Sequence, residues 1–229
     1  MKEFFQDKDV LFYMMLISAI IIIRVPVIGK YFRVFNTLIH ENAHAVMALL
    51  LNGSIKRMEL FSDLSGSATT TTKSKFATII VSFVGYPAAS FSSLLMLFLI
   101  QKHFYTELLI GILFLSVISL IFFVRNKYGI IWLMIFIVLN SLMYYSDSDI
   151  LIFLFLLFLS FIVLAESTVS SVELFFIALK NSSKAGDATN LKKSTHIPAI
   201  IWCFLFVVIS AYVLYLAVSI YFPYLNKLC

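Results

Sequence analysis

The chain has 229 residues, of which 62% are hydrophobic and only 13% are charged, and its mean hydropathy is +1.01. In soluble globular domains about half of the residues are apolar and about a quarter are charged, so this composition excludes an ordinary soluble domain. The net charge is +5, but the basic residues lie between apolar runs rather than in stripes with aromatic residues among them. We therefore expect the chain to reside in a lipid bilayer and to bind no nucleic acid.

Seven apolar runs in the sequence approach or exceed the ~20 residues that a helix needs to cross a bilayer. They cover about 10–28, 36–52, 76–101, 106–124, 128–145, 149–179 and 197–222. We expect an all-α membrane protein, with residues 1–229 forming a single domain built as a polytopic bundle of six or seven transmembrane helices. Arg24 and Pro26 interrupt the first run, which leaves open whether that run spans the membrane.

The second run contains the sequence His40-Glu41-Asn42-Ala43-His44, an HExxH motif. Helical residues four apart share a face, so His40 and His44 can direct ring nitrogens at one zinc ion with Glu41 beside it. In such sites a third protein ligand completes the set, and the zinc-bound water has its pKa lowered to ~7. Glu41 would act as the general base that takes the proton of this water.

The apolar surroundings of the motif strengthen this catalytic interpretation, because ionisable residues at membrane depth are costly and usually functional. The alternative is a histidine pair that hydrogen bonds satisfy inside a helix bundle. We expect Asn36 or Thr37 to cap the start of the motif helix, and Asn52-Gly53 to end it. In the next run, the small residue Gly85 predicts close packing against the motif helix, although Pro87 is equally compatible with an ordinary kink.

The longest polar interruption of the apolar pattern extends from Ser54 to Lys75. Apolar and charged residues alternate loosely in its first half, and its second half contains the Thr-rich run 69–72. Because Thr is frequent in strands, a short β-hairpin is one interpretation, and a flexible cytoplasmic loop is the other. A hairpin would offer an edge strand to which an extended peptide can add through main-chain hydrogen bonds.

The distribution of basic residues predicts the orientation of the chain in the membrane. With seven spans, 12 of the 17 Lys and Arg residues lie in the N-terminus, 53–75, 125–127 and 180–196. The positive-inside rule places these segments in the cytoplasm. Loops 53–75 and 180–196 stay cytoplasmic whether or not the first run spans, and we expect a multi-pass protein of a bacterial cytoplasmic membrane.

Three acidic residues follow in the later part of the chain. Glu166 comes after an unbroken apolar run and lies deep, where function is the default expectation for a carboxylate. Glu173, two helical turns further, lies towards the basic end of the run, where a solvated side chain is the simpler interpretation. Asp187 follows in a polar loop and is expected to be the N-cap of a short helix that ends before Pro198.

Together these residues resemble the site-2 protease family of membrane-embedded zinc metallopeptidases, and more closely its B-like branch of small multi-pass proteins. The matching features are spread over roughly residues 36–205: Thr37 to Leu51 around the HExxH motif, Asn52-Gly53 followed by a β-like loop with Gly66, Gly85-Tyr86, and Gly186-Asp187-Ala188 leading to Ile197-Pro198-Ala199-Ile200-Ile201-Trp202. The resemblance implies a zinc-dependent intramembrane endopeptidase, a hydrolase that cleaves membrane-anchored protein or peptide substrates.

The resemblance also assigns roles at the site. It implies that His40 and His44 bind one Zn²⁺ per chain and that Glu41 activates the zinc-bound water. The family usually supplies its third ligand from a Leu-Asp-Gly segment, which this sequence lacks, and Ser170 stands near the position expected for an acid in the B-like branch. We rank Glu166 first as the third ligand because of its depth, Glu173 second and Asp187 third.

Two other functions are compatible with the sequence. A non-catalytic membrane regulator or scaffold could retain the peptidase fold with an incomplete metal site, as the missing Leu-Asp-Gly segment suggests. A transporter or channel would need a polar path or duplicated halves, and the sequence has neither feature. No pattern in the chain assigns a substrate or an oligomeric state.

Overall fold

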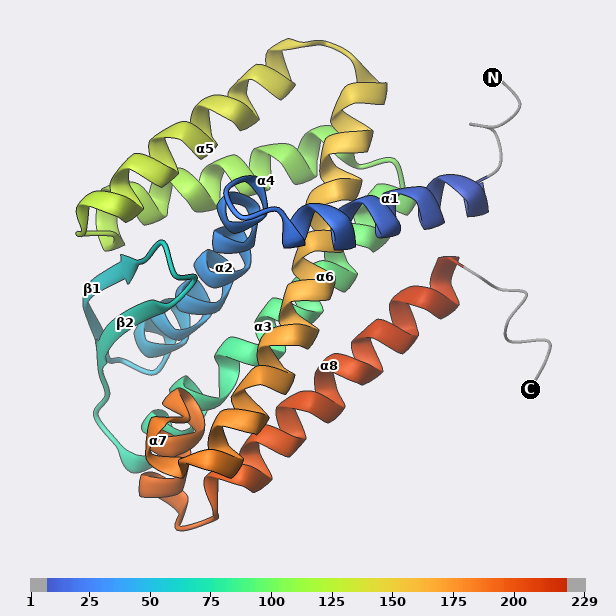
Figure 1. Cartoon of the computed structure of the whole chain (residues 1–229). Coiled ribbons are helices and arrows are strands. Elements are labelled where there is room, and N and C mark those ends of the chain that lie inside the picture. Colours follow the sequence, from blue (N-terminus) through green and yellow to red (C-terminus); the bar gives the residue numbers. More distant parts are fainter. Residues whose placement is uncertain (1–7, 222–229) are drawn as a thin grey trace.

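The computed structural model of the chain describes residues 8–221 (Figure 1). Helices account for most of the chain, and a two-stranded hairpin interrupts them after the second helix. The elements in order are α1 (Lys8–Arg24), α2 (Ile28–Leu50), β1 (Ser54–Leu60), β2 (Gly66–Thr71), α3 (Lys75–Gln101), α4 (Tyr105–Ile118), the π-helix η1 (Ser119–Phe123), α5 (Lys127–Tyr145), α6 (Asp149–Lys180), the 3₁₀-helix η2 (Ser182–Lys184), α7 (Gly186–Thr195) and α8 (Ala199–Tyr221).

Five helices in the described residues are long and apolar enough to cross a membrane: α3, α4 with η1, α5, α6 and α8. The first two helices form a pair that bends by 100° between Ile23 and Ile28, and this pair gives a sixth span if it is counted as one. The break falls at Arg24 and Pro26, the residues that interrupt the first apolar run. The chain is thus a helical multi-pass membrane protein, and the first two predicted helices form one bent pair.

Helix α6 is the centre of the bundle and contacts α1, α2, α3, α4 and α8 (Figure 1). Of its most apolar 18-residue window 61% is buried, against 28 to 44% for the other four spans. With 32 residues, this helix is ~48 Å long, more than the ~30 Å of a bilayer's hydrocarbon core. Its excess length carries the chain to α7, which lies on the same side of the molecule as the hairpin (Figure 1).

The motif helix α2 begins earlier than predicted. It starts at Ile28, so the expected capping role of Asn36 or Thr37 is wrong: both residues lie well inside the helix. The Thr37 hydroxyl instead donates to the carbonyl of Leu64 at 3.0 Å, which ties α2 to the turn of the hairpin. The predicted stop is confirmed, because Asn52 has a φ of 57° and the Gly53 N–H donates to the Ala48 carbonyl at 2.8 Å.

The predicted hairpin is present between Ser54 and Thr71, so the alternative interpretation of this segment as a flexible loop is wrong. Its strands are antiparallel, with Leu60 opposite Gly66 and a register irregularity between Ile55 and Arg57. The outer edge of β1 is covered, since Met58 bridges Val124 and the Asn126 side chain bonds to both the N–H and the carbonyl of Leu60. The outer edge of β2 has no strand partner within the described chain.

Candidate metal centre

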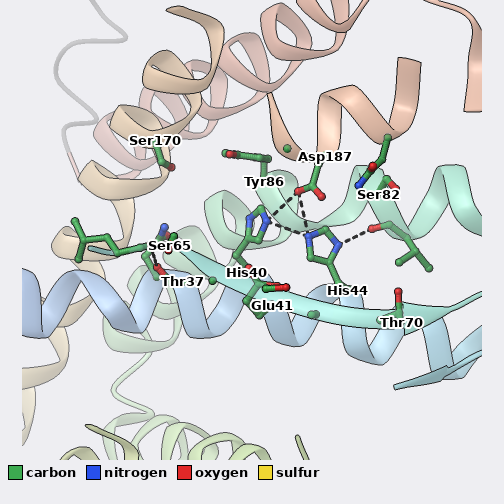
Figure 2. Close-up of a pocket in the computed structure, with 18 of the residues that line it drawn as sticks. Thr37, His40, Glu41, His44, Ser65, Thr70, Ser82, Tyr86, Ser170 and Asp187 are labelled. Atoms are coloured by element: carbon green, nitrogen blue, oxygen red, sulfur yellow. Dashed lines mark hydrogen bonds and ion pairs between the residues drawn. The ribbon is translucent and has the colours of Figure 1, made fainter. Parts of the chain in front are cut away.

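Two histidines of α2 form the centre of the site. His40 and His44 lie one helical turn apart on the face directed towards α3 and α7, and their Nε2 atoms are 3.0 Å from each other (Figure 2). The side chains are mostly buried, with exposed fractions of 15% for His40 and 7% for His44. The HExxH spacing therefore directs both imidazoles to one point, as the sequence predicts.

A carboxylate from a distant part of the chain reaches the same point. The Oδ2 atom of Asp187, in the first turn of α7, lies 3.0 Å from Nε2 of His40 and 3.1 Å from Nε2 of His44 (Figure 2). The expected N-cap role of Asp187 is wrong, because Ala185 is the N-cap residue and makes no side-chain cap bond. Burial raises the pKa of the Asp187 carboxyl, but the adjacent imidazoles of His44 and His40 outweigh it and lower this pKa below its ordinary value.

This triangle of atoms fits a catalytic zinc ion. Its sides of 3.0, 3.0 and 3.1 Å are close to the ~3.3 Å that separates ligand atoms at tetrahedral zinc, when each ligand lies ~2.0–2.1 Å from the metal. Two histidines and one carboxylate are also a donor set that catalytic zinc sites use. Within the described residues, His40, His44 and Asp187 form the only group of His, Cys, Asp or Glu with this geometry.

A backbone carbonyl fixes the orientation of His44. Its Nδ1 lies 2.6 Å from the carbonyl oxygen of Val81 on α3. A carbonyl oxygen can only accept a hydrogen bond, so Nδ1 carries a proton and Nε2 is the nitrogen that remains for a metal ion. Metal-binding histidines commonly have such a partner for their second nitrogen, because it sets the tautomer and the ring plane.

The other two candidate acids lie outside this cluster. Glu166 borders the same cavity, but its carboxylate forms a two-bonded ion pair with Arg33 of α2, with distances of 2.6 and 2.9 Å. Glu173 is exposed on α6. The structure thus brings together His40, His44 and the third-ranked acid Asp187, whereas the burial of Glu166 is accounted for by its partner Arg33.

Glu41 borders a cavity of about 450 Å³ that contains the histidines and Asp187. Its side chain is buried, with 5% exposed, and it forms no ion pair in the described part of the chain. Strand β2 lies directly over it: a Cβ on Gly66 would come within 2.6 Å of the Glu41 Oε1 atom. The cavity therefore combines a buried carboxylate without an ion-pair partner, two imidazoles and a strand edge.

Gly85 allows α3 to approach the two imidazoles. A Cβ at this position would lie 2.6 Å from Nε2 of His40 and 2.7 Å from Nε2 of His44. The predicted close packing between α3 and the motif helix is confirmed, and it occurs beside the Nε2 atoms of the two histidines. Tyr86, the next residue, packs its ring edge to face with His40, at 4.7 Å between centroids.

Two features of the site were not predicted from the sequence: the hydrogen bond of His44 to the Val81 carbonyl and the ion pair of Arg33 with Glu166. The Val81 carbonyl is a backbone group, so no side-chain pattern identifies it. The pairing of Arg33 with Glu166 has a weak signal, because Arg33 precedes His40 by seven residues and therefore lies near the same face of the motif helix. That cation could have been considered as a partner for a deep carboxylate.

Comparisons with known proteins agree with this description. A family model described as Peptidase M50B-like matches residues 13–217. No curated protein and no solved structure matches the chain. Because the family model covers most of the sequence, the chain belongs to the Peptidase M50B-like family, which is related to the site-2 proteases.

Proposed function

We propose that this protein is a zinc-dependent intramembrane endopeptidase that cleaves membrane-anchored proteins or peptides. The observation that carries the proposal is the convergence of His40 Nε2, His44 Nε2 and Asp187 Oδ2 at distances of 3.0 to 3.1 Å, with Glu41 in the same cavity. Family membership supports a peptidase activity on protein substrates.

His40, His44 and Asp187 would hold the metal, and Asp187 rather than Glu166 is the third ligand in this proposal. Bound zinc supplies Lewis-acid chemistry: it polarises the scissile carbonyl and makes water acidic enough to lose a proton near neutral pH. The Val81 carbonyl keeps the Nε2 lone pair of His44 directed into the site.

Glu41 is the residue we assign to proton transfer. It immediately follows His40 in the sequence, it is buried, and it forms no ion pair in the described chain. It would take the proton from the attacking water and then give it to the nitrogen of the leaving amine. Glu41 is only 5% exposed, and low exposure to water strengthens the electrostatic interactions of this carboxylate.

Strand β2 is the element we assign to substrate binding. Its outer edge has no strand partner in the described chain, and Gly66, Ser67, Ala68 and Thr70 border the cavity. The opposite edge of the hairpin is covered through Met58 and Leu60, so an added strand has one side available. An extended segment paired with β2 would present its backbone beside Glu41 and the histidines.

The alternative of a non-catalytic regulator rests on the lack of an evident third ligand. The position of Asp187 beside both imidazoles supports the peptidase proposal instead, and no observation in the described residues favours the alternative independently.

The proposed activity can be tested in membranes that contain many possible substrates. Membranes with the wild-type protein or Glu41→Gln would be compared for new protein N-termini by mass spectrometry. We expect the wild-type protein to produce new N-termini within or beside membrane spans. Glu41→Gln should reduce the amount of these termini by about 100-fold or more, because it removes the general base. Identical sets of termini from the two membranes would contradict the proposal.

A further inference from the structure

The cavity around the metal centre continues into a second one along strand β2. This second cavity has a volume of about 370 Å³ and shares Ala68, Thr70, Val81, Ser82 and Asn190 with the first. Beyond these shared residues its wall is formed by Thr69 and Thr72 of the hairpin segment, Thr78 of α3, and Lys193 and Ser194 of α7. The two cavities therefore form one groove, which is bounded by the hairpin and α7.

The residues that line the groove show along which axis it runs. Thr37, Ser65 and Ser170 lie at one end, Thr70 and Ser82 lie at the other, and the imidazoles with Asp187 lie between them (Figure 2). Strand β2 passes along this axis. An extended peptide added to β2 would therefore run past the metal centre and into the second cavity.

Lys193 is the only charged residue among the described residues that line the second cavity. Its side chain is exposed, and no hydrogen bond or ion pair to it occurs in the described chain. Its neighbour Lys192 differs, because its Nζ donates to the Ser182 hydroxyl at 3.3 Å and it does not line the groove. The groove thus offers one free ammonium group among Thr, Ser and Asn side chains.

The spacing along α7 relates this ammonium group to the scissile bond. Lys193 follows Asp187 by six residues of helix, which corresponds to ~9 Å along the axis. A residue of an extended peptide advances ~3.3 Å, so ~9 Å corresponds to about three residues. A side chain about three residues from the scissile bond would therefore lie opposite Lys193.

Building on the proposed peptidase function, we propose that Lys193 selects substrates with an acidic side chain about three residues from the cleaved bond. The free ammonium group would pair with an Asp or Glu and would repel a Lys or Arg at that position. An exposed ion pair of this kind changes affinity by about twofold to fivefold, and the effect decreases at high salt because the charges are screened.

The test uses the full chain purified in detergent. The probes are fluorescein-labelled peptides of Ala, Val and Thr, nine residues long, each with one Asp, Asn or Lys at successive positions. Binding is measured by fluorescence anisotropy to the Glu41→Gln protein, so that no turnover is needed. The same measurements are made after adding Lys193→Glu and, as the matched control, Lys192→Glu. Wild-type protein is incubated with the same peptides, and mass spectrometry locates the cleaved bond.

We expect one position, about three residues from the cleaved bond, at which Asp binds about twofold to fivefold more tightly than Asn. Lys193→Glu should invert this preference in favour of Lys, and Lys192→Glu should leave it unchanged. Peptides that bind with the same charge preference in all three proteins would overturn the inference but not the proposed function. Absence of both binding and cleavage would overturn both. If Lys193→Glu changes only binding to anionic lipid vesicles, Lys193 is a lipid contact and the inference fails.

Discussion

At the scale of single residues, Gly85 provides the most sensitive test of the metal centre. Adding a methyl group would place a carbon 2.5 to 2.7 Å from atoms of His40 and His44. We predict that Gly85→Ala displaces the imidazoles and weakens zinc binding by about tenfold or more, by analogy with changes to groups that orient metal ligands. Competition with a fluorescent zinc chelator measures this affinity.

Gly111 offers the matched control for that substitution. It lies in α4, and a Cβ at this position meets no atom within 4 Å. Gly111→Ala should leave zinc affinity unchanged. The account of Gly85 is contradicted if Gly85→Ala binds zinc as tightly as Gly111→Ala does.

The ion pair between Arg33 and Glu166 leads to a second prediction at this scale. Glu166→Gln leaves the mostly buried guanidinium of Arg33 without a counter-charge, so we expect a loss of ~3 kcal/mol in unfolding free energy with zinc retained. Replacing both residues by Met should restore much of the stability, because no unpaired charge remains. Thermal unfolding, monitored by tryptophan fluorescence, measures these changes in stability. Loss of zinc from a Glu166→Gln protein of unchanged stability would identify Glu166 as a ligand instead.

The sequence predicts the local half of the site but not its distant half. His40, Glu41 and His44 follow from a spacing of four on one helix, which depends only on local helical geometry. The choice among Glu166, Glu173 and Asp187 depends on long-range contacts. Arg33 and Glu166 are 133 positions apart in the sequence, and His40 and Asp187 are 147 positions apart. Depth in the bilayer favoured Glu166, but depth does not reveal that Arg33 is its partner, nor that α7 turns Asp187 towards the histidines.

At the scale of elements, Asn126 should control the position of the hairpin. Its side chain donates to the Leu60 carbonyl at 2.5 Å and accepts from the Leu60 N–H at 3.1 Å, so it takes the place of a strand at the edge of β1. Asn126→Ala removes both bonds, which costs ~1–3 kcal/mol locally. We predict faster hydrogen exchange in 54–71 and reduced cleavage, with zinc still bound.

Mass-spectrometric hydrogen exchange compares this variant with Lys127→Ala, which changes the neighbouring exposed residue at the start of α5. Lys127→Ala should leave exchange in the hairpin unchanged. Equal exchange rates in the two variants would show that Asn126 does not hold the hairpin.

Element positions were more predictable than element ends. The stop of α2 at Asn52-Gly53 follows from the left-handed conformation that Asn52 adopts, and the hairpin follows from its Thr-rich second strand. Asn36 and Thr37 do not reveal the start of α2. An Asn or Thr side chain can cap a helix only where the preceding residues are not helical, and the residue type alone does not show whether they are. Here α2 begins at Ile28, with Val27 as its N-cap residue, so Asn36 and Thr37 are already helical.

At the scale of the whole molecule, the bundle predicts which loops share a side of the membrane. The hairpin pairs with Val124 and Asn126, and α7 lies beside the same cavity, so three basic segments meet at one end. In a protein lacking Cys203 and Cys229, we predict that Lys56→Cys and Lys184→Cys react with an impermeant maleimide only after lysis, because we place that end in the cytoplasm. Ser146→Cys, at the opposite end of α5, should react in intact cells, and labelling of all three from outside would contradict this orientation.

The number of spans shows the limit of hydropathy alone. Composition correctly indicates a multi-pass helical protein, and five of the predicted runs correspond to separate spans. The first two runs form a pair bent by 100° at the break that contains Arg24 and Pro26, and run length does not specify such a bend.

The most direct test of the account is the zinc content of the detergent-purified protein, measured by elemental analysis. The wild-type protein and Glu166→Gln should each contain about one zinc ion per chain, whereas His44→Ala and Asp187→Asn should lose it. Circular dichroism of each sample verifies that the helices remain folded. A well-folded wild-type protein without zinc, or an Asp187→Asn protein that retains zinc while Glu166→Gln loses it, would contradict the metal centre described above.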